Sequence, residues 1–443
     1  MSLVEKVTKG LRKEGFKKYA GNVSWMFLGY VVRIGAKFFV GIYIARYLGA
    51  EDYGLYSYAM SFALTFEVLV KLGFRDIVIR EIAGGDQDNS TVISTVLVLK
   101  IGGALLGLLL TFVSSMIINA PYETTLVVIA SLFLLFETFD VLDYLFQAKV
   151  LAKYTVRASI VSTAIASIIK FAFIMLELPL IYFVASFALE ALLYSAFLYF
   201  FFRKHFSLRL RLRTKYLTSP MALELFKDSW PLAVAMAVTT VNGSIDKVMV
   251  KNMLDSTALG YYAVGMRLYG SLSYVPFAIC ATLFPAIINA RKHSSALYAQ
   301  RMKELYMLMF WIATAGAFTL VFFAEEVVVG LFTEEFRGAI KVLQISAYTM
   351  IPLFLGSALN KYLVAEKLTR INIIRSTAAV VTNLGLNLLL IPRYGIEGAA
   401  TATLVAGTMS VIVVPGFVKS TRQQIWWMIK GSSLVVLLNR IRS

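Results

Sequence analysis

Two basic side chains stand in the middle of the first long apolar stretch of the chain. Residues 23–48 read VSWMFLGYVVRIGAKFFVGIYIARYL, with Arg33 and Lys37 near the centre. A helix needs about 20 apolar residues, at roughly 1.5 Å each, to cross a bilayer, so both cations fall near the membrane midplane. Their spacing of four residues places them on one face. Each charge costs about 2.5–3.5 kcal/mol at that depth, so this face must meet an acidic partner or a watery cavity.

The two solutions imply different chemistry. With an acidic partner, Arg33 and Lys37 would belong to a buried structural ion pair. In a cavity they would form a wall that binds anions, because both groups donate charge-assisted hydrogen bonds to phosphate oxygens. We expect the second arrangement, an anion-binding wall in a transport pathway.

Further charges lie within the later apolar segments, and the two signs are nearly balanced. A uniformly basic cavity therefore does not follow from the count, and each residue has to be interpreted from its position. Lys100, Lys170 and Lys247 are candidates either for substrate binding or for internal ion pairs. The complete set consists of Arg33, Lys37, Lys71, Lys100, Lys170, Lys247 and Arg267, with the acids Glu67, Glu137, Asp140, Asp143, Glu190 and Asp246.

Two of the cations near helix ends have a local interpretation. Glu67 and Lys71 are four residues apart, which predicts a structural pair along one helix. Lys71 and Lys100 lie toward the inner ends of their helices, where a long side chain can snorkel to the membrane surface.

The acids of the first half leave alternatives open. Asp140, Asp143 and Gln147 follow one helix face at spacings of three and four. That face could accept protons or sodium, or it could answer nearby cytoplasmic lysines. Glu190 is an isolated midplane acid, which is a candidate proton site by default, although a pair with Lys170 is equally compatible with the sequence.

The second half carries one informative cation. Arg267 has no acid three or four residues away, so it needs a tertiary partner or a substrate. Asp246 could pair across an interface or bind a coupling ion, while Lys247 points roughly 100° away from it on the same helix. From the residues alone, we assign anion binding to Arg33 and Lys37, a tertiary partner or a substrate to Arg267, and possible ion coupling to Asp140, Asp143, Glu190 and Asp246.

Composition restricts the class of protein. The chain has 443 residues, 59% of them hydrophobic and only 16% charged, and its mean hydropathy is +0.74. These values exclude a soluble globular chain and predict an all-α polytopic membrane protein. The single Cys280 permits no internal disulfide, and two histidines cannot form a histidine-based metal site. The sequence contains neither a P-loop nor a nucleotide fingerprint, so we expect no enzyme activity, metal or cofactor.

The apolar segments fall into two groups of six. About 12 transmembrane helices are therefore expected, six in an N-lobe (residues 23–202) and six in a C-lobe (228–418). A basic linker (203–227) joins the lobes, a basic N-terminus (1–22) precedes them, and a tail (419–443) follows. The segments are residues 23–48, 54–74, 91–118, 122–148, 155–177 and 179–202, then 229–252, 258–288, 305–323, 338–360, 371–391 and 396–418.

Charge outside these segments predicts the orientation. Most of the 43 Lys and Arg residues lie at the N-terminus, in the linker, in the tail and in alternate connections, whereas the longest outer connection (324–337) is rich in glutamate. The positive-inside rule then places both termini in the cytoplasm, in a multi-pass protein of the cell (inner) membrane. The tail contains Trp426 and Trp427, and for residues 423–438 we expect an interfacial helix rather than part of a further span.

A weak repeat connects the two halves. Leu48, Gly54, Tyr56 and Met60 match Leu254, Gly260, Tyr262 and Met266 at a constant offset of 206 residues. An even number of helices in each repeat gives both halves the same orientation in the membrane. The sequence therefore predicts a pseudo-two-fold axis along the membrane normal, with the substrate bound between the halves.

Four stretches resemble a known family. IARYLGAEDYGLYSYAMSF (residues 44–62), SIDKVMVKNMLDSTALGYYAVGMRLYGSL (244–272), LNKYLVAEK (359–367) and NLLLIPRYGIEGAATAT (387–403) are similar to segments of the polysaccharide-biosynthesis (Wzx-type) flippases. These proteins belong to the multidrug/oligosaccharidyl-lipid/polysaccharide (MOP) exporter superfamily, together with MurJ and the MATE transporters.

The resemblance implies a function and a site. It implies two six-helix lobes around a cavity that move an oligosaccharide on a polyprenyl diphosphate from the inner to the outer leaflet by alternating access. Related cavities use cations on helices 1, 2 and 8 to hold the diphosphate. The resemblance therefore implies diphosphate binding by Arg33 and Lys37 on helix 1 and by Arg267 on helix 8. Helix 2 departs from that pattern, because Lys71 lies near its inner end.

The remaining expectations concern partners and competing functions. Membership implies a lipid-linked oligosaccharide and membrane lipids as partners, possible association with polysaccharide polymerase or ligase machinery, and no nucleic acid. Possible energy sources are Na⁺ or H⁺ coupling and the membrane potential. The main competitor is a MATE-like cation-coupled multidrug exporter, kept open by Asp140, Asp143 and Asp246. A scaffold for a polysaccharide synthase is a further alternative.

Overall fold

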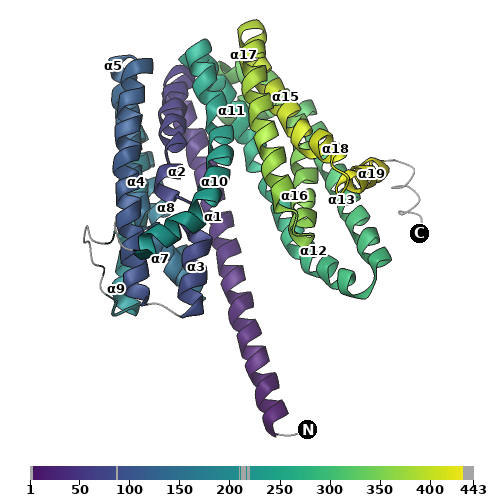
Figure 1. Ribbon diagram of the computed structural model, residues 1–443. Coiled ribbons are helices and arrows are strands. Elements are labelled where there is room, and N and C mark those ends of the chain that lie inside the picture. The colour runs from purple at the N-terminus through teal and green to yellow at the C-terminus, as the bar shows by residue number, and fades with distance from the viewer. Residues whose placement is uncertain (1–2, 86–87, 209, 211–215, 217–219, 433–443) are drawn as a thin grey trace. The chain divides into compact units, whose positions relative to one another are not determined.

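The computed structural model describes residues 3–85, 88–208, 210, 216 and 220–432, and these residues are almost entirely helical (Figure 1). Contacts divide the chain into two compact units. Unit 1 comprises Met1–Tyr47 and Ala59–Thr240, and unit 2 comprises Leu48–Tyr58 and Val241–Ser443. The residues of the tail after 432 lie outside the described part, as do residues 209, 211–215 and 217–219 of the linker.

The helices of the N-terminal half begin and end where the sequence supplies caps. Asp88 accepts hydrogen bonds from the backbone of Ser90 and Thr91 at the start of α4, and Pro121 opens α5 at a position that needs no N–H donor. The helices are α1 (Leu3–Thr65), α2 (Val68–Lys71), α3 (Phe74–Gly84), α4 (Asn89–Ile118), α5 (Pro121–Ser131), α6 (Phe133–Glu137), the 3₁₀ turn η1 (Thr138–Asp140), α7 (Val141–Ala148), α8 (Ala152–Met175) and α9 (Leu180–His205).

The C-terminal half follows the same rules. Asp255 caps α11 by accepting a 2.7 Å hydrogen bond from Ala258. The elements are α10 (Pro220–Met253), α11 (Ser256–Ser271), α12 (Tyr274–His293), α13 (Ser295–Phe322), α14 (Ala324–Phe332), the 3₁₀ turn η3 (Glu334–Gly338), α15 (Ala339–Tyr348), α16 (Met350–Ala365), α17 (Thr369–Thr408), the π-helical turn η4 (Met409–Val413), α18 (Val414–Phe417) and α19 (Arg422–Gly431).

Eight helical spans among the described residues are long and apolar enough to cross a membrane. One of them, Arg370–Phe417, contains two of the expected segments, joined at Gly395, where φ is +57°. The three expected segments outside these eight spans lie mainly in α1 and α10 and carry charged residues such as Arg33, Lys37 and Asp246. The chain is therefore an all-α, multi-pass membrane protein.

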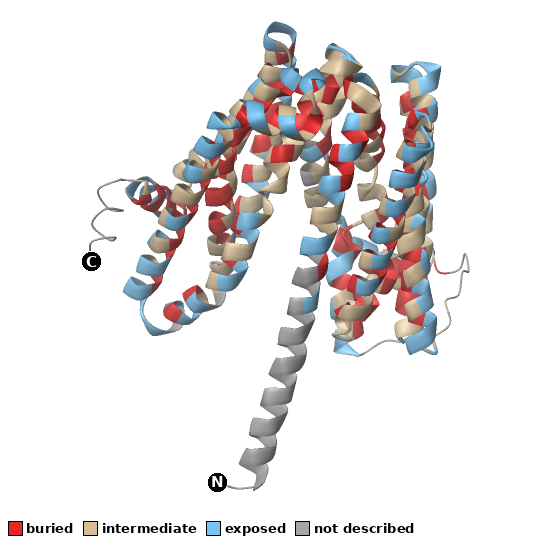
Figure 2. Cartoon of the chain, turned by 180° about the vertical axis from the view of Figure 1, so that it is seen from behind, coloured by how far each residue is buried: buried red, intermediate tan, exposed pale blue. Residues whose placement is uncertain are grey.

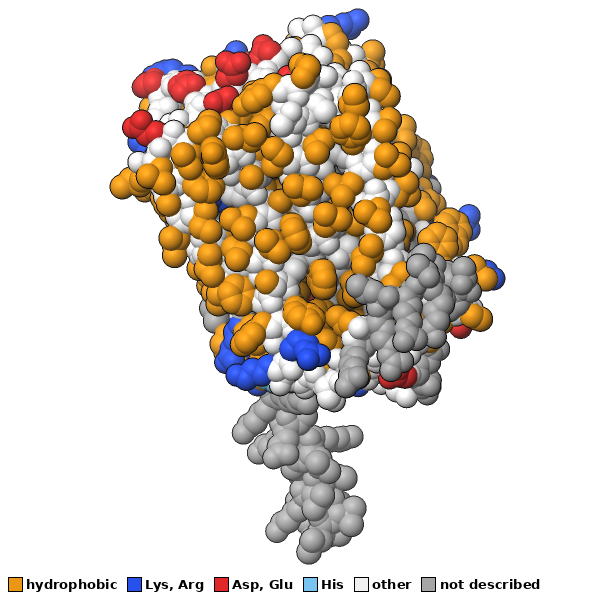
Figure 3. Space-filling view, turned by 90° about the vertical axis from the view of Figure 1, so that its left-hand side faces the viewer, with side chains coloured by type: hydrophobic (Ala, Val, Ile, Leu, Met, Phe, Trp, Pro, Cys, Tyr) orange, Lys and Arg blue, Asp and Glu red, His pale blue; other side chains and the backbone are white. Residues whose placement is uncertain are grey.

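Exposed apolar side chains cover the outside of the spans. On α4, Leu109 is 57% exposed and Ile117 is 79% exposed, which suits a helix that faces lipid. Figure 3 shows hydrophobic side chains over most of the visible face, with charged side chains toward its upper and lower ends and edges. Buried residues lie instead where helices face one another within each unit (Figure 2).

The first two expected helices meet within α1 at a sharp kink. Gly49 has φ +72° inside α1, a conformation that only glycine adopts without strain. Beyond the bend, the Glu335 carboxylate accepts a 2.6 Å hydrogen bond from the Ala50 N–H, so a negative charge meets the new helix N-terminus. The expected connection at residues 49–53 is therefore present, and it consists of a sharp kink at Gly49.

The outer connection after α13 is acidic, as the sequence indicates, but it is folded. Arg337 pairs there with Glu325 at 2.9 Å and with Glu334. All three side chains are largely exposed, so these pairs contribute little to stability.

Unit 2 contains a segment from the first half of the sequence. Leu48–Tyr58 groups with unit 2, while α10 up to Thr240 groups with unit 1. Leu48–Tyr58 groups with unit 2 because small residues allow it to cross α11 at close range. A Cβ on Gly54 would lie 1.8 Å from the Ser256 carbonyl oxygen, and one on Gly260 would lie 1.9 Å from the Ala50 carbonyl oxygen.

This crossing uses positions that the repeat relates. At the offset of 206, Ala50 corresponds to Ser256 and Gly54 corresponds to Gly260. The contact of Gly54 with Ser256 is therefore equivalent to the contact of Gly260 with Ala50. Such reciprocal contact is the property of a two-fold interface. The relation of the complete lobes by a pseudo-two-fold axis stays a prediction.

The tail forms a helix that packs into unit 2. In α19, Trp427 is 6% exposed and lies 5.5 Å from the Lys303 ammonium, whereas Trp426 is 56% exposed. Gln424 accepts a hydrogen bond from Tyr306. Only Trp426 is therefore placed to meet the membrane interface, while Trp427 packs inside unit 2, because neighbouring residues of a helix point about 100° apart.

We predict that Gly54→Ala or Gly260→Ala destabilises the protein by about 1–3 kcal/mol, because the new methyl group would overlap a backbone carbonyl. The measurement is the thermal unfolding midpoint of the detergent-solubilised chain. Gly270→Ala is the matched control, since the space that its new methyl group would enter is open to 4 Å. Equal midpoints for all three variants would contradict the close crossing.

Candidate functional site

A polar cavity of about 880 Å³ opens within unit 1. Ten of its lining residues are charged, with acids outnumbering cations at the surface. Behind this lining, Lys100 and Lys170 bond to two of the acids. The charged lining residues are Arg33, Lys37, Glu67, Lys71, Arg75, Asp76, Glu137, Asp140, Asp143 and Glu190.

The helix 1 cations both face this cavity. Arg33 and Lys37 line it from α1, as their spacing of four residues requires. The Lys37 ammonium lies 3.0 Å from a Glu190 oxygen, and 53% of the Lys37 side chain is exposed. The structure therefore combines the two solutions open to the sequence, because the cations line a cavity and one of them also has an acidic partner.

Glu190 is paired with cations from two helices. Its second oxygen lies 3.0 Å from the Lys170 ammonium on α8, and Thr163 donates a 3.3 Å hydrogen bond to the first oxygen. Of the two roles left open for Glu190, the structure shows the ion pair with Lys170. An additional role in ion coupling stays a prediction.

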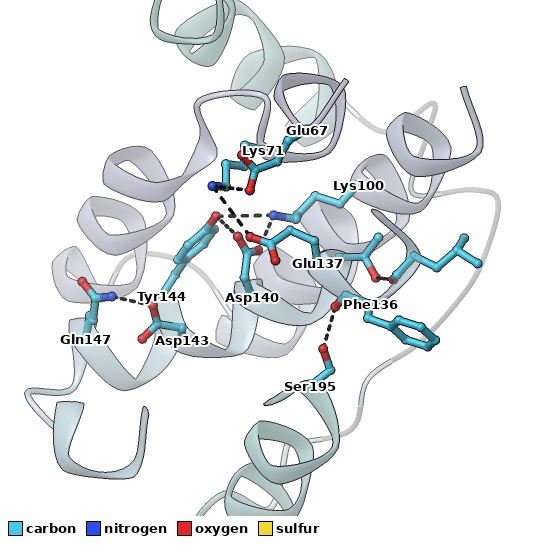
Figure 4. Close-up of polar contacts among 12 residues, drawn as sticks. Glu67, Lys71, Lys100, Phe136, Glu137, Asp140, Asp143, Tyr144, Gln147 and Ser195 are labelled. Atoms are coloured by element: carbon cyan, nitrogen blue, oxygen red, sulfur yellow. Dashed lines mark hydrogen bonds and ion pairs between the residues drawn. The ribbon is translucent and has the colours of Figure 1, made fainter. Parts of the chain in front are cut away.

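A second ion-pair group joins α2 to α6. Lys71 lies 2.7 Å from Glu67 and 3.8 Å from Glu137 (Figure 4). The predicted pairing of Glu67 with Lys71 is confirmed. Leu72 and Gly73 both adopt positive φ and end α2 directly after Lys71, which fixes the lysine at the cavity wall.

A third group is buried most deeply. Lys100 has a fully buried side chain and forms an ion pair with Asp140, whose other oxygen accepts a 2.6 Å hydrogen bond from Tyr144. Figure 4 shows Lys100 directed toward Asp140 and Tyr144. Of the roles left open for Lys100, the structure shows the internal ion pair and not snorkelling, because an acid on the neighbouring helix compensates its charge inside the unit.

The acidic helix is not a regular helix. Between α6 and α7 the turn η1 tightens the backbone at Thr138–Asp140, so Glu137 and Asp140 meet different lysines. Gln147 donates a 2.7 Å hydrogen bond to Asp143 and accepts one of 3.0 Å from Arg75. Asp140, Asp143 and Gln147 all line the cavity, as a shared face predicts.

Asp246 lies in unit 2 within a network of neutral donors. Its carboxylate is 6% exposed and accepts hydrogen bonds from Asn387 at 2.7 Å, Thr403 at 2.9 Å and Tyr262 at 3.1 Å. Asn387 also donates to Asn383, one turn earlier on α17. The carboxylate and the two hydroxyl oxygens are ligand types that hard cations prefer, whereas Asn387 contributes an amide N–H.

Arg267 also belongs to unit 2 and so does not line the unit 1 cavity. Its guanidinium donates a 3.0 Å hydrogen bond to the Tyr53 hydroxyl. Lys247 lies near enough for the two like charges to repel each other. Joint binding of one anion by Arg33, Lys37 and Arg267 stays a prediction.

Several site residues were missed by the sequence reasoning. Arg75 and Asp76 directly follow the second apolar segment, where flanking charges are ordinary, and Tyr194 has no distinguishing pattern around it. Asn383 and Asn387, four residues apart in an apolar helix, were a usable signal. Arg375 is buried and bonds to Asn360 and Asn372.

The family model described as polysaccharide biosynthesis protein matches residues 19–291. The chain belongs to this family. It is also 20% identical over 398 residues to the capsular polysaccharide biosynthesis protein CapF of Staphylococcus aureus, a match that covers 88% of this chain and 97% of that relative. The resemblance to the polysaccharide-biosynthesis family is therefore confirmed.

Solved structures of MOP-superfamily transporters share the fold. The inward closed conformation of the lipid II flippase MurJ has a TM-score of 0.72 and 16% identity, covering 92% of this chain and 90% of that chain. An inward-facing multidrug resistance MATE transporter has a TM-score of 0.69 and 13% identity, covering 91% and 99%. These likenesses confirm the predicted MATE/MurJ-like fold class.

We predict that removing one partner of the Lys100–Asp140 pair, with Lys100→Met or Asp140→Asn, destabilises unit 1 by about 3–5 kcal/mol for the charge left buried. The double variant should recover most of this loss. Thermal unfolding in detergent measures it.

The control is Glu325→Gln, which removes an exposed pair with Arg337 and should change stability by about 0–1 kcal/mol. Single variants as stable as the control would contradict a buried pair at Lys100.

Proposed function

We propose that the chain is a flippase for cell-surface polysaccharide synthesis. It would move an oligosaccharide, linked through a diphosphate to a polyprenyl carrier, from the inner to the outer leaflet of the cytoplasmic membrane. The observation that carries this proposal is the unit 1 cavity with Arg33 and Lys37 on its wall, in a chain of the polysaccharide biosynthesis family. CapF and MurJ support the same class of substrate through their names.

The physical case rests on the cost of moving a diphosphate through hydrocarbon. A lipid tail can remain in the bilayer, but the diphosphate and sugars need a polar path. Lysine and arginine bind phosphate oxygens with charge-assisted hydrogen bonds, and the many polar groups of the cavity suit sugar hydroxyls. In a membrane that is negative inside, outward movement of an anion is favoured by about 2.3 kcal/mol per charge per 100 mV.

The alternative function is a cation-coupled multidrug exporter. The MATE likeness fits this alternative, and so does a buried acid such as Asp246. Against it, Asp140 and Glu190 are already neutralised by lysines, which leaves few acids for a cationic drug. The flippase therefore accounts for more of the site. From the positive-inside rule we expect both of its termini in the cytoplasm.

We further propose Asp246 as the site of ion coupling, by Na⁺ or by a proton. Thr403 and Tyr262 place hydroxyl oxygens beside its carboxylate, and the side-chain oxygen of Asn383 lies one hydrogen bond further away, on the Asn387 amide. A bound Na⁺ or a proton would remove the cost of the buried charge. Binding there would link the energy of an ion gradient to the positions of α10 and α17.

We predict that Arg33→Ala, Lys37→Ala and Arg267→Ala each reduce flipping of a lipid-linked oligosaccharide in proteoliposomes. The loss of one charge-assisted contact of about 1.5–3 kcal/mol corresponds to a decrease of about 10- to 100-fold. Lys341→Ala, at a lysine whose side chain is 71% exposed, is the control. Unchanged flipping in all three variants would exclude the cationic wall.

We predict that Asp246→Asn abolishes the dependence of transport on a Na⁺ or pH gradient while leaving a basal rate driven by the membrane potential. Flipping is measured with each gradient imposed alone. Glu397→Gln, at an acid that is 43% exposed, should keep the dependence. Drug efflux that is sensitive to Asp140 or Asp246, without flipping, would instead favour the exporter.

A further inference from the structure

Glu190 occupies an unusual position among the acids of unit 1. It comes from α9, while its two cations come from α1 and α8. Each of its oxygens meets one ammonium group at 3.0 Å, so the carboxylate is divided between Lys37 and Lys170. The other two groups differ, because Glu67 pairs within its own turn and Asp140 bonds to a fully buried lysine.

The two lysines of Glu190 differ in exposure. The Lys170 side chain is 10% exposed and the Lys37 side chain 53% exposed. Lys170 is thus an internal anchor for the carboxylate, and Thr163 adds a hydrogen bond from α8. Lys37 presents its ammonium to the cavity and can exchange one oxygen partner for another without moving the anchor.

A carboxylate oxygen and a phosphate oxygen are equivalent partners for an ammonium group, since both accept charge-assisted hydrogen bonds. The group formed by Glu190 and its two lysines holds two cations and one anion, so its net charge favours an anionic ligand. An oxygen at 3.0 Å from the Lys37 ammonium already occupies one of its bonding positions. A diphosphate that binds Lys37 therefore has to share this lysine with Glu190 or displace it.

We infer that Glu190 is an internal counter-ion that competes with the substrate's diphosphate for Lys37. This inference rests on the proposed function and adds to it a residue that sets affinity and release. In the empty cavity Glu190 bonds to both lysines. When the diphosphate binds, Lys37 turns to it and the carboxylate stays on Lys170. On release, Glu190 takes back Lys37.

The competition has a transport purpose. A site that carries a polyanion across a membrane must bind it well enough to load it and weakly enough to let it go. An acid anchored beside the cationic wall limits the affinity of the wall without removing its charge. Glu190 therefore sets the affinity of the site and the release of the substrate, in addition to stabilising unit 1 through its ion pairs.

The test uses the full chain in lipid nanodiscs and farnesyl diphosphate, a soluble polyprenyl diphosphate, as the probe. We expect Glu190→Gln to lower the Kd at least fivefold, because Lys37 no longer has an internal competitor. The matched control is Asp228→Asn, which removes one negative charge from unit 1 at an exposed residue outside the cavity lining, and it should change the Kd less than twofold.

A double-variant cycle separates local competition from a change in overall charge. In a Lys37→Ala background, the effect of Glu190→Gln should disappear. An unchanged or higher Kd for Glu190→Gln, or a gain that persists without Lys37, would overturn the inference. Should Glu190→Gln fold poorly, Glu190→Asp shortens the side chain so that it no longer reaches both lysines, and it should lower the Kd in the same direction.

Flipping of a lipid-linked oligosaccharide by the same variants separates this inference from the proposed function. We expect Glu190→Gln to bind tighter and to turn over more slowly. A wild type that flips, together with an unchanged Kd for Glu190→Gln, would refute the counter-ion and keep the flippase. If Glu190→Gln lowers the Kd but the wild type never flips the lipid-linked oligosaccharide, the flippase is refuted and the counter-ion is kept.

Discussion

The cost of placing charge in a low-dielectric interior governs unit 1. Its cations and acids are distributed over separate helices, and each buried charge of Lys100, Lys170 and Glu190 is compensated by a partner from another helix. A single uncompensated charge there would cost several kcal/mol. The ion pairs therefore determine which helices are neighbours and in what register, and the polar cavity is the space that remains where the pairs are incompletely enclosed.

Much of this organisation follows from the sequence. The apolar segments, the basic inner flanks and the central position of Arg33 and Lys37 are local properties, and the apolar spans fall where they are expected. The pairing of Glu67 with Lys71 also follows from spacing along one helix. The buried cations and acids could be counted from the sequence, but their partners could not be assigned, because these depend on which helices pack together.

The features that residue spacing along the sequence could not predict are contacts between residues on different helices. Lys100 is buried because Asp140 lies on a neighbouring helix, and Asp246 meets Asn387 and Thr403 from a segment about 140 residues or more away in sequence. The turn η1 gives no composition signal, yet it directs Glu137 and Asp140 to different lysines. The kink at Gly49 lies in the expected connection between the first two segments, but its geometry could not be predicted, because a glycine between two apolar stretches has the same appearance in a loop and in a kink.

The exchange of Leu48–Tyr58 into unit 2 has a consequence for biosynthesis. This segment is synthesised early, but the residues that it crosses, Ser256 and Gly260, follow about 200 residues later. A membrane-inserted N-terminal half must therefore keep the segment accessible until α11 has been inserted. For the same reason, a chain divided at the basic linker would leave the second fragment without one of its own packing elements, so the two fragments should assemble only when they are produced together.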